Sequence, residues 1–249
     1  MLALLLALLA ASPPGAETRL PVAAVEVHDG DTITLTVEGD RQTVRYLLID
    51  APELHHPARP EEELGREARD LNARLLALGP LRVTFDEETY DVYGRRLAYL
   101  WVEAPGGELL VNAELVRAGL ALPLFIPPNE RHRKKILDAL RGAKARGAGL
   151  WSDGRRKVFT ANQLWSEAPY LAGAFVTVRL TIERADVSGD RLLLTGDRVT
   201  LSAHRNEDTE PLWTLRPGQT VHALGKVLLS RGRCEIRLTS AEQILSLSD

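Results

Sequence analysis

Short runs of alternating apolar and polar residues, each ended by a turn sequence, dominate this chain and restrict it to a fold built on β-strands. Residues 32–37 are rich in β-branched residues, Glu38-Gly39-Asp40 is typical of a hairpin turn, and residues 41–49 are expected to return as a strand. Before them, residues 21–27 alternate loosely and end at the turn sequence Asp29-Gly30. The chain is therefore expected to open as a β-meander.

Three amphipathic stretches predict helices after this meander. At residues 64–78 the leucines and Ala68 step by four and three, and Gly79-Pro80 ends the run. Residues 111–118 predict a short helix, and a longer one is expected to be capped by Asn129. Strands are expected at residues 81–85 and 96–102, so the first half predicts an α+β domain.

The second half of the chain reads as wholly β. Val176, Val178, Leu180 and Ile182 alternate strictly, and similar sets recur up to Leu238 between glycine-containing turns. Five short strands over about eighty residues predict a second, small all-β barrel, most simply an OB-like one, with a small sandwich as the alternative. The expected organisation is a signal peptide at 1–16, a first domain at 17–152, a linker at 153–170 and a barrel domain at 171–249.

Composition narrows the function only slightly. The net charge of −3 is divided into −4 over residues 1–151 and +1 over residues 152–249, so the strongly basic footprint of many nucleic-acid binders is absent. A nuclease remains compatible with this charge, because its metal ion supplies local positive charge. Cys234 is the single cysteine, which excludes an internal disulfide.

The amino-terminus resembles an export signal. An unbroken apolar run from Leu2 to Ala10 precedes small residues at Ala11 and Ala16, and it is too short to span a bilayer as a helix. Lysine and arginine are missing before the run, which departs from the usual pattern. A buried N-terminal helix is the alternative. We expect a cleaved signal peptide, a secreted or periplasmic protein, and no stable membrane association.

Three short segments carry the chemistry. They are Asp29-Gly30-Asp31-Thr32, the stretch from Arg45 to Glu53 that ends Ile49-Asp50-Ala51-Pro52-Glu53, and Asp91-Val92-Tyr93-Gly94-Arg95. The carboxylates of Asp31 and Asp50 suit a hard cation such as Ca²⁺ better than Zn²⁺. Glu53 is a spare carboxylate that could deprotonate water, and Arg45 and Arg95 could grip a phosphate from two sides. Each segment alone is typical of an ordinary turn or strand, so their joint order is what indicates a phosphodiesterase site.

The order and spacing of these segments over residues 22–152 closely resemble the staphylococcal nuclease (thermonuclease) family. The resemblance implies an OB-type five-stranded barrel with three helices, in a mainly β fold with α-helices. It implies that Asp31, Asp50 and the backbone carbonyl of Ala51 bind Ca²⁺ and that Glu53 is the general base. It further implies the phosphate-binding residues Arg45 and Arg95 and, for the nucleotide, Tyr93. Residues 122–125 depart from the family, and Phe125 is the candidate replacement for a nucleotide-stacking tyrosine.

The resulting hypothesis is an exported, monomeric, Ca²⁺-dependent nuclease. It is expected to cleave DNA and leave 3′-phosphate ends, and whether it also cleaves RNA is left open. The alternative is a catalytically weak or inactive module that binds nucleic acid or protein. Such modules usually lack the base or an arginine, whereas the residues of both kinds are present here.

Other charged residues are given ordinary roles. His55 and His56 are interpreted as solvated loop residues rather than zinc ligands. A basic stretch before and within the third helix is interpreted as a solvated face: Arg131, Arg133, Lys134 and Lys135. In the second half, arginines that could contact a phosphate backbone are more simply interpreted as solvated edge residues: Arg179, Arg184, Arg191, Arg231 and Arg233.

Overall fold

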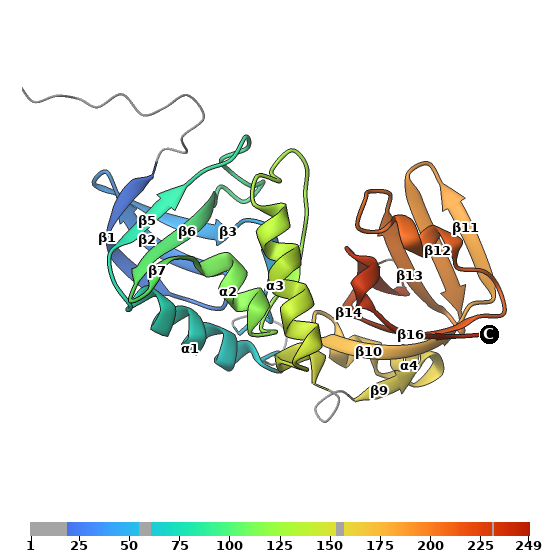
Figure 1. The fold of residues 1–249 in the computed structure, drawn as a ribbon. Helices are drawn as coiled ribbons and strands as arrows, with labels where there is room; N and C mark the ends of the chain where they lie inside the picture. The colour runs from blue at the N-terminus through green and yellow to red at the C-terminus, as the bar shows by residue number, and fades with distance from the viewer. Residues whose placement is uncertain (1–18, 55–60, 153–156, 231) are drawn as a thin grey trace, which may run out of the picture.

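The structure, a computed structural model, describes residues 19–54, 61–152, 157–230 and 232–249. The predicted signal peptide, His55, His56 and Arg231 lie outside the described residues. Figure 1 shows two lobes, the first built from the amino-terminal half and the second from the carboxy-terminal half. In the described part of the chain, every helix falls short of the length and apolar character needed to cross a bilayer.

The first lobe is a five-stranded barrel. Its strands are β1 (Leu20–Val27), β2 (Thr32–Val37), β3 (Asp40–Tyr46), β5 (Leu81–Thr84) and β6 (Arg96–Ala104). They pair in the order β3-β2-β1-β5-β6, and a parallel pairing of β3 with β6 closes the ring. Strand β7 (Gly107–Leu110) extends β6 as a hairpin, and the short strands β4 (Ile49–Asp50) and β8 (Leu122–Pro123) pair beside the barrel. The prediction of a five-stranded barrel with helices is confirmed for this lobe.

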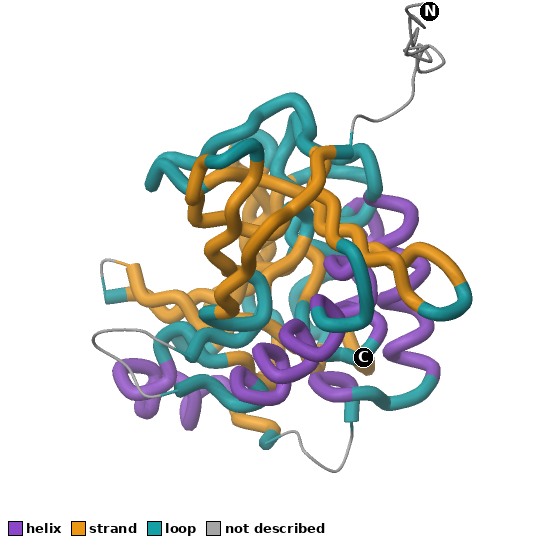
Figure 2. The backbone as a smooth tube through the Cα atoms, turned by 90° about the vertical axis from the view of Figure 1, so that its left-hand side faces the viewer, coloured by secondary structure: helices purple, strands orange, loops and turns teal. Residues whose placement is uncertain are grey.

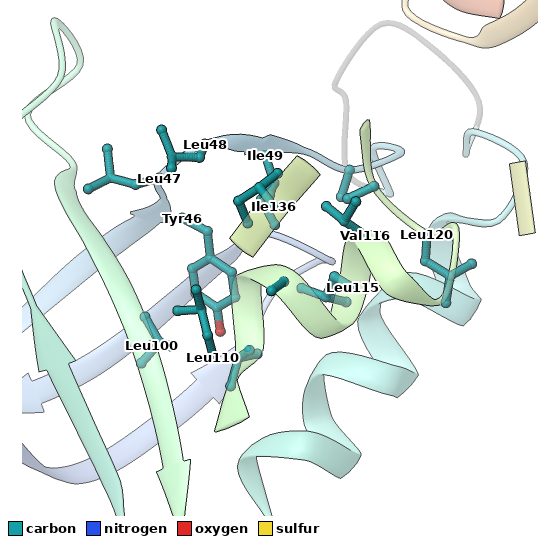
Figure 3. Packing of buried hydrophobic residues seen from close by; sticks show 14 of the residues in the cluster. Tyr46, Leu47, Leu48, Ile49, Leu100, Leu110, Leu115, Val116, Leu120 and Ile136 are labelled. Atoms are coloured by element: carbon teal, nitrogen blue, oxygen red, sulfur yellow. The ribbon is translucent and has the colours of Figure 1, made fainter. Parts of the chain in front are cut away.

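Three helices cover this barrel on one side, namely α1 (Gly65–Leu76), α2 (Val111–Arg117) and α3 (Arg133–Ala145). Figure 2 shows the helices gathered along one side of the strands. The predicted inward residues of the third helix, Ile136, Leu140 and Ala143, are fully buried. Helix α1 buries Ala68 and Leu75, whereas Leu78 lies beyond its end and is exposed. These faces meet the strands in the core drawn in Figure 3.

Two buried asparagines connect the helices to the segments that carry the candidate site. Asn112 on α2 donates to the carbonyl of Leu47, and its side-chain oxygen accepts from the backbone of Leu100. Asn72 on α1 donates to the carbonyl of Asp29, and its oxygen accepts from the hydroxyl of Tyr46. Because these amides satisfy backbone groups that cannot reach water, they fix where α1 and α2 sit on the barrel.

The predicted helix cap at Asn129 is wrong. Helix α3 begins at Arg133, with His132 at the N-cap and no side-chain cap bond. Asn129 is buried and instead makes two hydrogen bonds with the backbone of Glu88. The local sequence is typical of a cap, but the long-range pairing satisfies the amide more completely, so Asn129 closes the loop beside the candidate site.

The second lobe is a mixed sheet rather than the predicted closed barrel. Its strands are β9 (Val158–Thr160), β10 (Phe175–Thr181), β11 (Arg184–Ser188), β12 (Arg191–Gly196), β13 (Val199–His204), β14 (Thr220–Ser230), β15 (Arg233–Leu238) and β16 (Ile244–Ser248). They run in the order β11-β12-β13-β15-β14-β10-β9, with β16 attached to β14. The parallel pair β13–β15 makes the sheet mixed. Alternation shows which face of a strand is buried but not which edges pair, and here β9 occupies the edge of β10.

From residue 158 onward, the predicted linker at 153–170 is structured. It forms strand β9 and helix α4 (Ala161–Leu171), and Thr160 caps this helix with a reciprocal bond to Gln163. Phe159, Leu164 and Ala168 are buried in the second core. The second half is therefore not all-β, since it contains helix α4. The apolar side chains of β9 and α4 cover part of the sheet that would otherwise face water.

The two lobes are joined by specific contacts. Arg133 on α3 pairs with Asp208 at 2.5 Å, and the hydroxyl of Thr239 donates to the carbonyl of Pro123. Arg133 is thus mostly buried in an interlobe ion pair. The sequence analysis had placed it on a solvated face, and for this residue that interpretation is wrong. Leu224 on β14 is buried within the core of the first lobe. The lobes therefore share apolar surface as well as polar contacts.

Candidate functional site

The turn before β2 presents the first of the predicted site carboxylates. Asp29 accepts hydrogen bonds from the backbone of Asp31 and Thr32 at 3.0 and 2.6 Å, which closes the turn. A Cβ atom on Gly30 would lie 2.7 Å from the Cβ atoms of both Ala51 and Ala68. Glycine at this position therefore lets the turn approach both β4 and α1, and places Asp31 beside Ala51.

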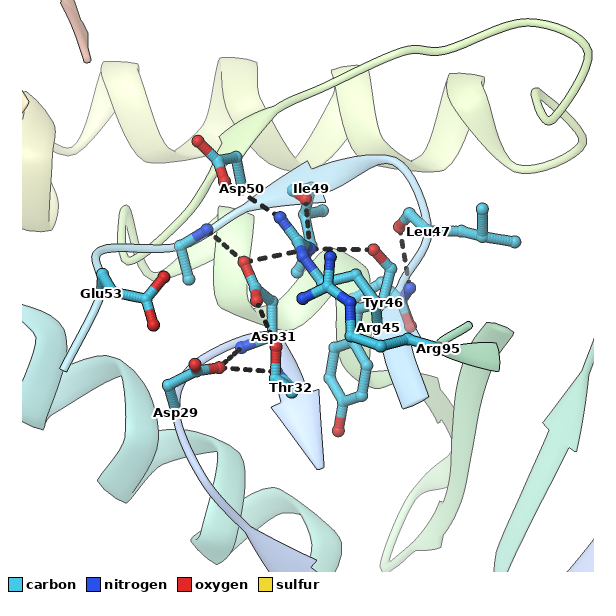
Figure 4. Close-up of polar contacts among 12 residues, drawn as sticks. Asp29, Asp31, Thr32, Arg45, Tyr46, Leu47, Ile49, Asp50, Glu53 and Arg95 are labelled. Atoms are coloured by element: carbon cyan, nitrogen blue, oxygen red, sulfur yellow. Dashed lines mark hydrogen bonds and ion pairs between the residues drawn. The ribbon is translucent and has the colours of Figure 1, made fainter. Parts of the chain in front are cut away.

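Arg45 brings the two predicted metal ligands together (Figure 4). Its guanidinium lies 3.1 Å from Asp31 Oδ2 and 2.9 Å from Asp50 Oδ1, and it also donates to the carbonyls of Tyr46 and Ile49. Leu48 has a left-handed backbone conformation with φ of 66°, which turns the chain sharply between β3 and β4. This turn allows Arg45 and Asp50 to meet, and Asp31 joins them from a third strand end.

The cluster carries excess negative charge. Burial raises the pKa of Asp31 and of Asp29 above their ordinary values, and the guanidinium of Arg45 only partly opposes this. Burial would lower the pKa of Arg45, but Asp31 and Asp50 raise it, so the guanidinium remains charged. Five carboxylates interact with Arg45 or with Lys226: Asp29, Asp31, Asp50, Glu53 and Glu62. A further cation would therefore be favoured here.

Glu53, the predicted base, lies at the edge of this cluster. Figure 4 draws its carboxylate on the same side as Asp31 and Asp29, apart from the arginine that links Asp31 with Asp50. The backbone N–H of Glu53 donates to Glu62 at 2.8 Å, and the backbone N–H of Glu62 donates back to the carbonyl of Glu53. Burial raises the pKa of Glu62 to about 7. Glu62 thus holds the backbone of the proposed base, which the sequence did not indicate.

Arg95 reaches the site from a separate loop. Asp91 orders that loop by accepting from the backbone of Tyr93 and Arg95 and from the Arg95 side chain at 2.7 Å. Arg45 and Arg95 line one cavity of about 340 Å³, which Tyr93 also lines. The structure therefore brings together both predicted arginines and the predicted nucleotide-binding tyrosine.

Phe125 does not fit its predicted role as a stacking residue. It belongs to the hydrophobic core and is 8% exposed, with the guanidinium of Arg133 above its ring at 5.2 Å. The apolar run at residues 122–125 is better explained by strand β8 and by core packing. The exposed aromatic residues near the cavity are Tyr90 and Tyr93, which are 53% and 81% exposed.

Lys226 is a second residue at the site that the sequence did not reveal. Its ammonium, on β14 of the second lobe, lies 3.0 Å from Asp50 Oδ2. Burial would lower the pKa of Lys226, but Asp50 and Glu62 raise it above its ordinary value. Lys226 stands 176 positions after Asp50 within an ordinary strand pattern. Only the packing of the two lobes brings it here.

The donor set suits Ca²⁺ in its chemistry. Asp31, Asp50 and the carbonyl of Ala51 are hard oxygen donors at the point of excess negative charge, which is what Ca²⁺ requires. Among the described residues, no group of three or more His, Cys, Asp or Glu side chains is gathered as a metal site, so backbone oxygen and water would have to complete the shell. Both oxygens of Asp50 already contact cations, so Lys226 would share or release one of them.

Comparisons with known proteins agree with this geometry. Residues 43–153 match the family described as staphylococcal nuclease homologue. The thermonuclease of Staphylococcus hyicus is 34% identical over 129 residues, which cover 52% of this chain and 74% of that protein. The thermonuclease of Staphylococcus intermedius is 34% identical over 125 residues, covering 50% and 72%. The SPbeta prophage-derived endonuclease YokF of Bacillus subtilis is 36% identical over 126 residues, covering 50% and 41%.

The alignment with the two thermonucleases thus spans nearly three quarters of each relative, and the matched family region contains Arg45, Asp50, Glu53 and Arg95 on a five-stranded barrel. On these grounds, the chain belongs to the staphylococcal nuclease family.

Proposed function

We propose that this protein is an exported nuclease that hydrolyses phosphodiester bonds of DNA with Ca²⁺ and leaves 3′-phosphate ends. Membership of a family whose relatives are named thermonuclease and endonuclease supports the reaction class. The observation that carries the proposal is the position of Arg45 between Asp31 and Asp50, with Arg95 lining the same cavity. RNA is a second substrate that the same assay tests.

The site residues have three separate roles in hydrolysis: metal binding, phosphate binding and proton transfer. Asp31, Asp50 and the carbonyl of Ala51 would hold Ca²⁺, which supplies positive charge to the phosphate when bound. Arg45 and Arg95 bind the non-bridging oxygens and stabilise the negative charge that develops on them. Glu53 accepts a proton from the attacking water, the water oxygen bonds to phosphorus, and the bond to the 5′-oxygen breaks. The departing 5′-oxygen takes up a proton from solvent, so a 3′-phosphate and a 5′-hydroxyl result.

A direct test measures cleavage of single- and double-stranded DNA and RNA by the purified protein, with Ca²⁺, Mg²⁺ or a chelator. We expect cleavage of DNA with Ca²⁺, no cleavage with the chelator, and 3′-phosphate on the products. Full activity in excess chelator would contradict the metal dependence. Export is tested separately, by finding whether the cells release a protein that lacks the first residues.

Glu53→Gln separates the nuclease from a binding module. The change removes a base but keeps the side chain's shape, so we expect kcat to fall about 10²–10⁴-fold while nucleic-acid binding is nearly kept. Glu63→Gln is the matched control, because Glu63 is exposed and near in sequence, and its kcat should not change. Arg95→Ala should also slow turnover, by about 3 kcal/mol of transition-state stabilisation. Normal turnover in both Glu53→Gln and Arg95→Ala would instead favour the binding module.

A further inference from the structure

The second lobe carries a row of residues, on the face of its sheet opposite the core, that leads to the candidate site. The strand registers pair Asp186 with Leu193, Leu193 with Ser202, and Ser202 with Arg237. Val227 and Ile236 form the last pair between antiparallel β14 and β15, and the residues directly beyond it, Lys226 and Arg237, line one crevice together. Paired residues lie on one face of a sheet, so this row crosses from β11 to β14. The alternate residues on these strands, such as Leu192, Leu201 and Ile236, form the buried core on the other face.

This outer face is strongly basic in a chain whose net charge is −3. The row and the groove next to it contain six cations: Arg184, Arg191, Arg198, Lys226, Arg233 and Arg237. Three carboxylates accompany them: Asp50, which pairs with Lys226, and Asp186 and Glu235. Glu235 pairs with Arg191 at 2.7 Å, and Asp186 lies 4.0 Å from Arg184. The positive charge therefore exceeds what the face neutralises by itself.

Two of these arginines are available to a ligand. Within the described residues, no carboxylate lies at ion-pair distance from Arg233 or Arg237, and both side chains belong to exposed residues. The groove at the far end has a volume of about 460 Å³ and is lined by Arg191, Arg233 and the half-buried Trp165. The face thus combines guanidinium groups with an aromatic ring, a combination found in sites for single-stranded nucleic acid.

The near end of the face is continuous with the candidate site. Lys226 contacts Asp50 at 3.0 Å, and a crevice of about 90 Å³ between the lobes is lined by Asp50, Lys226 and Arg237 together. In Figure 1, β14 lies on the side of the second lobe that faces α3, and β13, β12 and β11 follow away from the first lobe. Four strand spacings of about 4.8 Å give the row a length of about 19 Å.

We propose that this face binds a single-stranded segment of the nucleic acid that continues beyond the phosphate cleaved in the first lobe. Arg237 and Arg233 bind successive parts of its backbone, and Trp165 contacts a base at the far end. The choice of nucleic acid as the occupant rests on the proposed function, because the face begins where that substrate would be cut. The second lobe then determines how tightly long substrates bind, without taking part in the chemistry.

The test compares two double variants with the same change in net charge. Arg233→Glu with Arg237→Glu changes the face, and Arg179→Glu with Arg216→Glu changes exposed arginines outside it. Affinity for a labelled single-stranded oligonucleotide of about 15 nucleotides is measured by fluorescence anisotropy in chelator, where the proposed cleavage stops. We expect Kd to rise at least about tenfold for the face variant and under about threefold for the control. Loss of two phosphate contacts should also reduce the salt slope of log K by about 1.4.

Kinetics with Ca²⁺ separate this proposal from the proposed function. For the face variant, KM should rise on the long oligonucleotide while kcat stays constant, and cleavage of a dinucleotide should not change. Arg233→Lys with Arg237→Lys should restore most of the affinity, which excludes misfolding as the cause. If the wild-type protein cleaves nothing, the proposed function fails, yet the binding difference in chelator can still hold.

Equal weakening in the two Glu variants, or none in either, would overturn the proposal. The proposal would also be overturned if the oligonucleotide bound equally well to all variants while vesicles containing acidic lipid bound through Arg233 and Arg237. In that case the basic face would serve a membrane surface instead.

Discussion

At the scale of single residues, the site is a balance of buried charges in which Lys226 is an unexpected member. Asp50 lies between Arg45 and Lys226, with one carboxylate oxygen contacting each. The same carboxylate is the proposed Ca²⁺ ligand. Two cations that approach one carboxylate repel each other, so metal and ammonium should compete for Asp50.

Lys226→Met should therefore strengthen Ca²⁺ binding. Methionine keeps the length and apolar stem of lysine and removes its charge, so we expect the Kd for Ca²⁺ to fall about tenfold, equivalent to about 1.4 kcal/mol. Isothermal titration calorimetry without substrate measures this directly. Lys157→Met, a change at an exposed lysine directly before β9, is the control. An unchanged or weaker affinity for Ca²⁺ in Lys226→Met would show that the ammonium does not compete.

Glu62 gives a pH dependence whose sign follows from its burial. Its pKa is raised in the folded protein to about 7, above the usual 4.5, so the folded state holds the proton more tightly than the unfolded state. The stabilisation is complete below about pH 4.5 and is lost as the pH rises through 7. The Glu62→Gln variant has no titratable group at this position, so it lacks this pH-dependent change in stability.

Urea unfolding in chelator should show this difference. The free energy of unfolding of the wild type, relative to Glu62→Gln, should fall by up to about 3 kcal/mol between pH 4.5 and pH 8. The exposed Glu63→Gln should show no such trend relative to the wild type. A difference between wild type and Glu62→Gln that is constant with pH would mean that Glu62 titrates normally.

At the scale of elements, the site depends on how closely the turn before β2 approaches β4 and α1. Three segments meet there, and no side chain larger than hydrogen fits between them at Gly30. The hydrogen bond from Ala51 to Asp31 at 2.6 Å and the bond from Asn72 to Asp29 hold the same approach. Backbone proximity thus sets the position of the carboxylates.

Gly30→Ala should therefore damage both stability and activity. A Cβ atom 2.7 Å from two alanine methyl groups forces the turn away, which we expect to cost about 1–3 kcal/mol of unfolding free energy. The displaced Asp31 should also weaken Ca²⁺ binding. Gly142→Ala on α3 is the control, because only the flexible end of Arg146 lies near and alanine favours a helix by about 0.5–1 kcal/mol. A Gly30→Ala protein with wild-type stability and Ca²⁺ affinity would refute this account.

At the scale of the whole molecule, the two lobes have separate cores and a shared contact. The core of the first lobe takes its buried residues from 33–151, with Leu224 added from the second lobe. Polar contacts at Arg133, Lys144 and Thr239 fasten the lobes together. The first lobe should therefore fold alone, but with less stability than it has in the full chain.

A fragment of residues 17–152 tests this expectation. We expect cooperative unfolding, cleavage of DNA, and a loss of about 2–3 kcal/mol, the value of one buried leucine, because the Leu224 contact is missing. Leu224→Ala in the full chain is the matched comparison and should lose a similar amount. If the fragment is unfolded while Leu224→Ala is stable, the two lobes form one cooperative unit and the predicted boundary at residue 152 is wrong.

The sequence alone determined the strands and helices of the first lobe and most of its candidate site. Hydrophobic periodicity marks which side chains turn inward, and this local property fixed the inward faces of α1 and α3. Asp31, Arg45, Asp50, Glu53 and Arg95 could be named because the joint order and spacing of their three motifs resemble the staphylococcal nuclease family. The exposed Tyr93 and the buried Phe125 show the limit, since both are aromatic and only packing separates them.

Only the tertiary structure decided the rest, because the deciding contacts join residues far apart in the chain. The alternation of residues along a strand does not show which strand edges pair. It therefore could not predict that β9 pairs with β10 or that the second sheet stays open. Asn129 has a capping sequence, yet its partner is Glu88 on another loop. Lys226 reaches Asp50 because the lobes pack through Leu224, and a lysine in an ordinary strand carries no local sign of that contact.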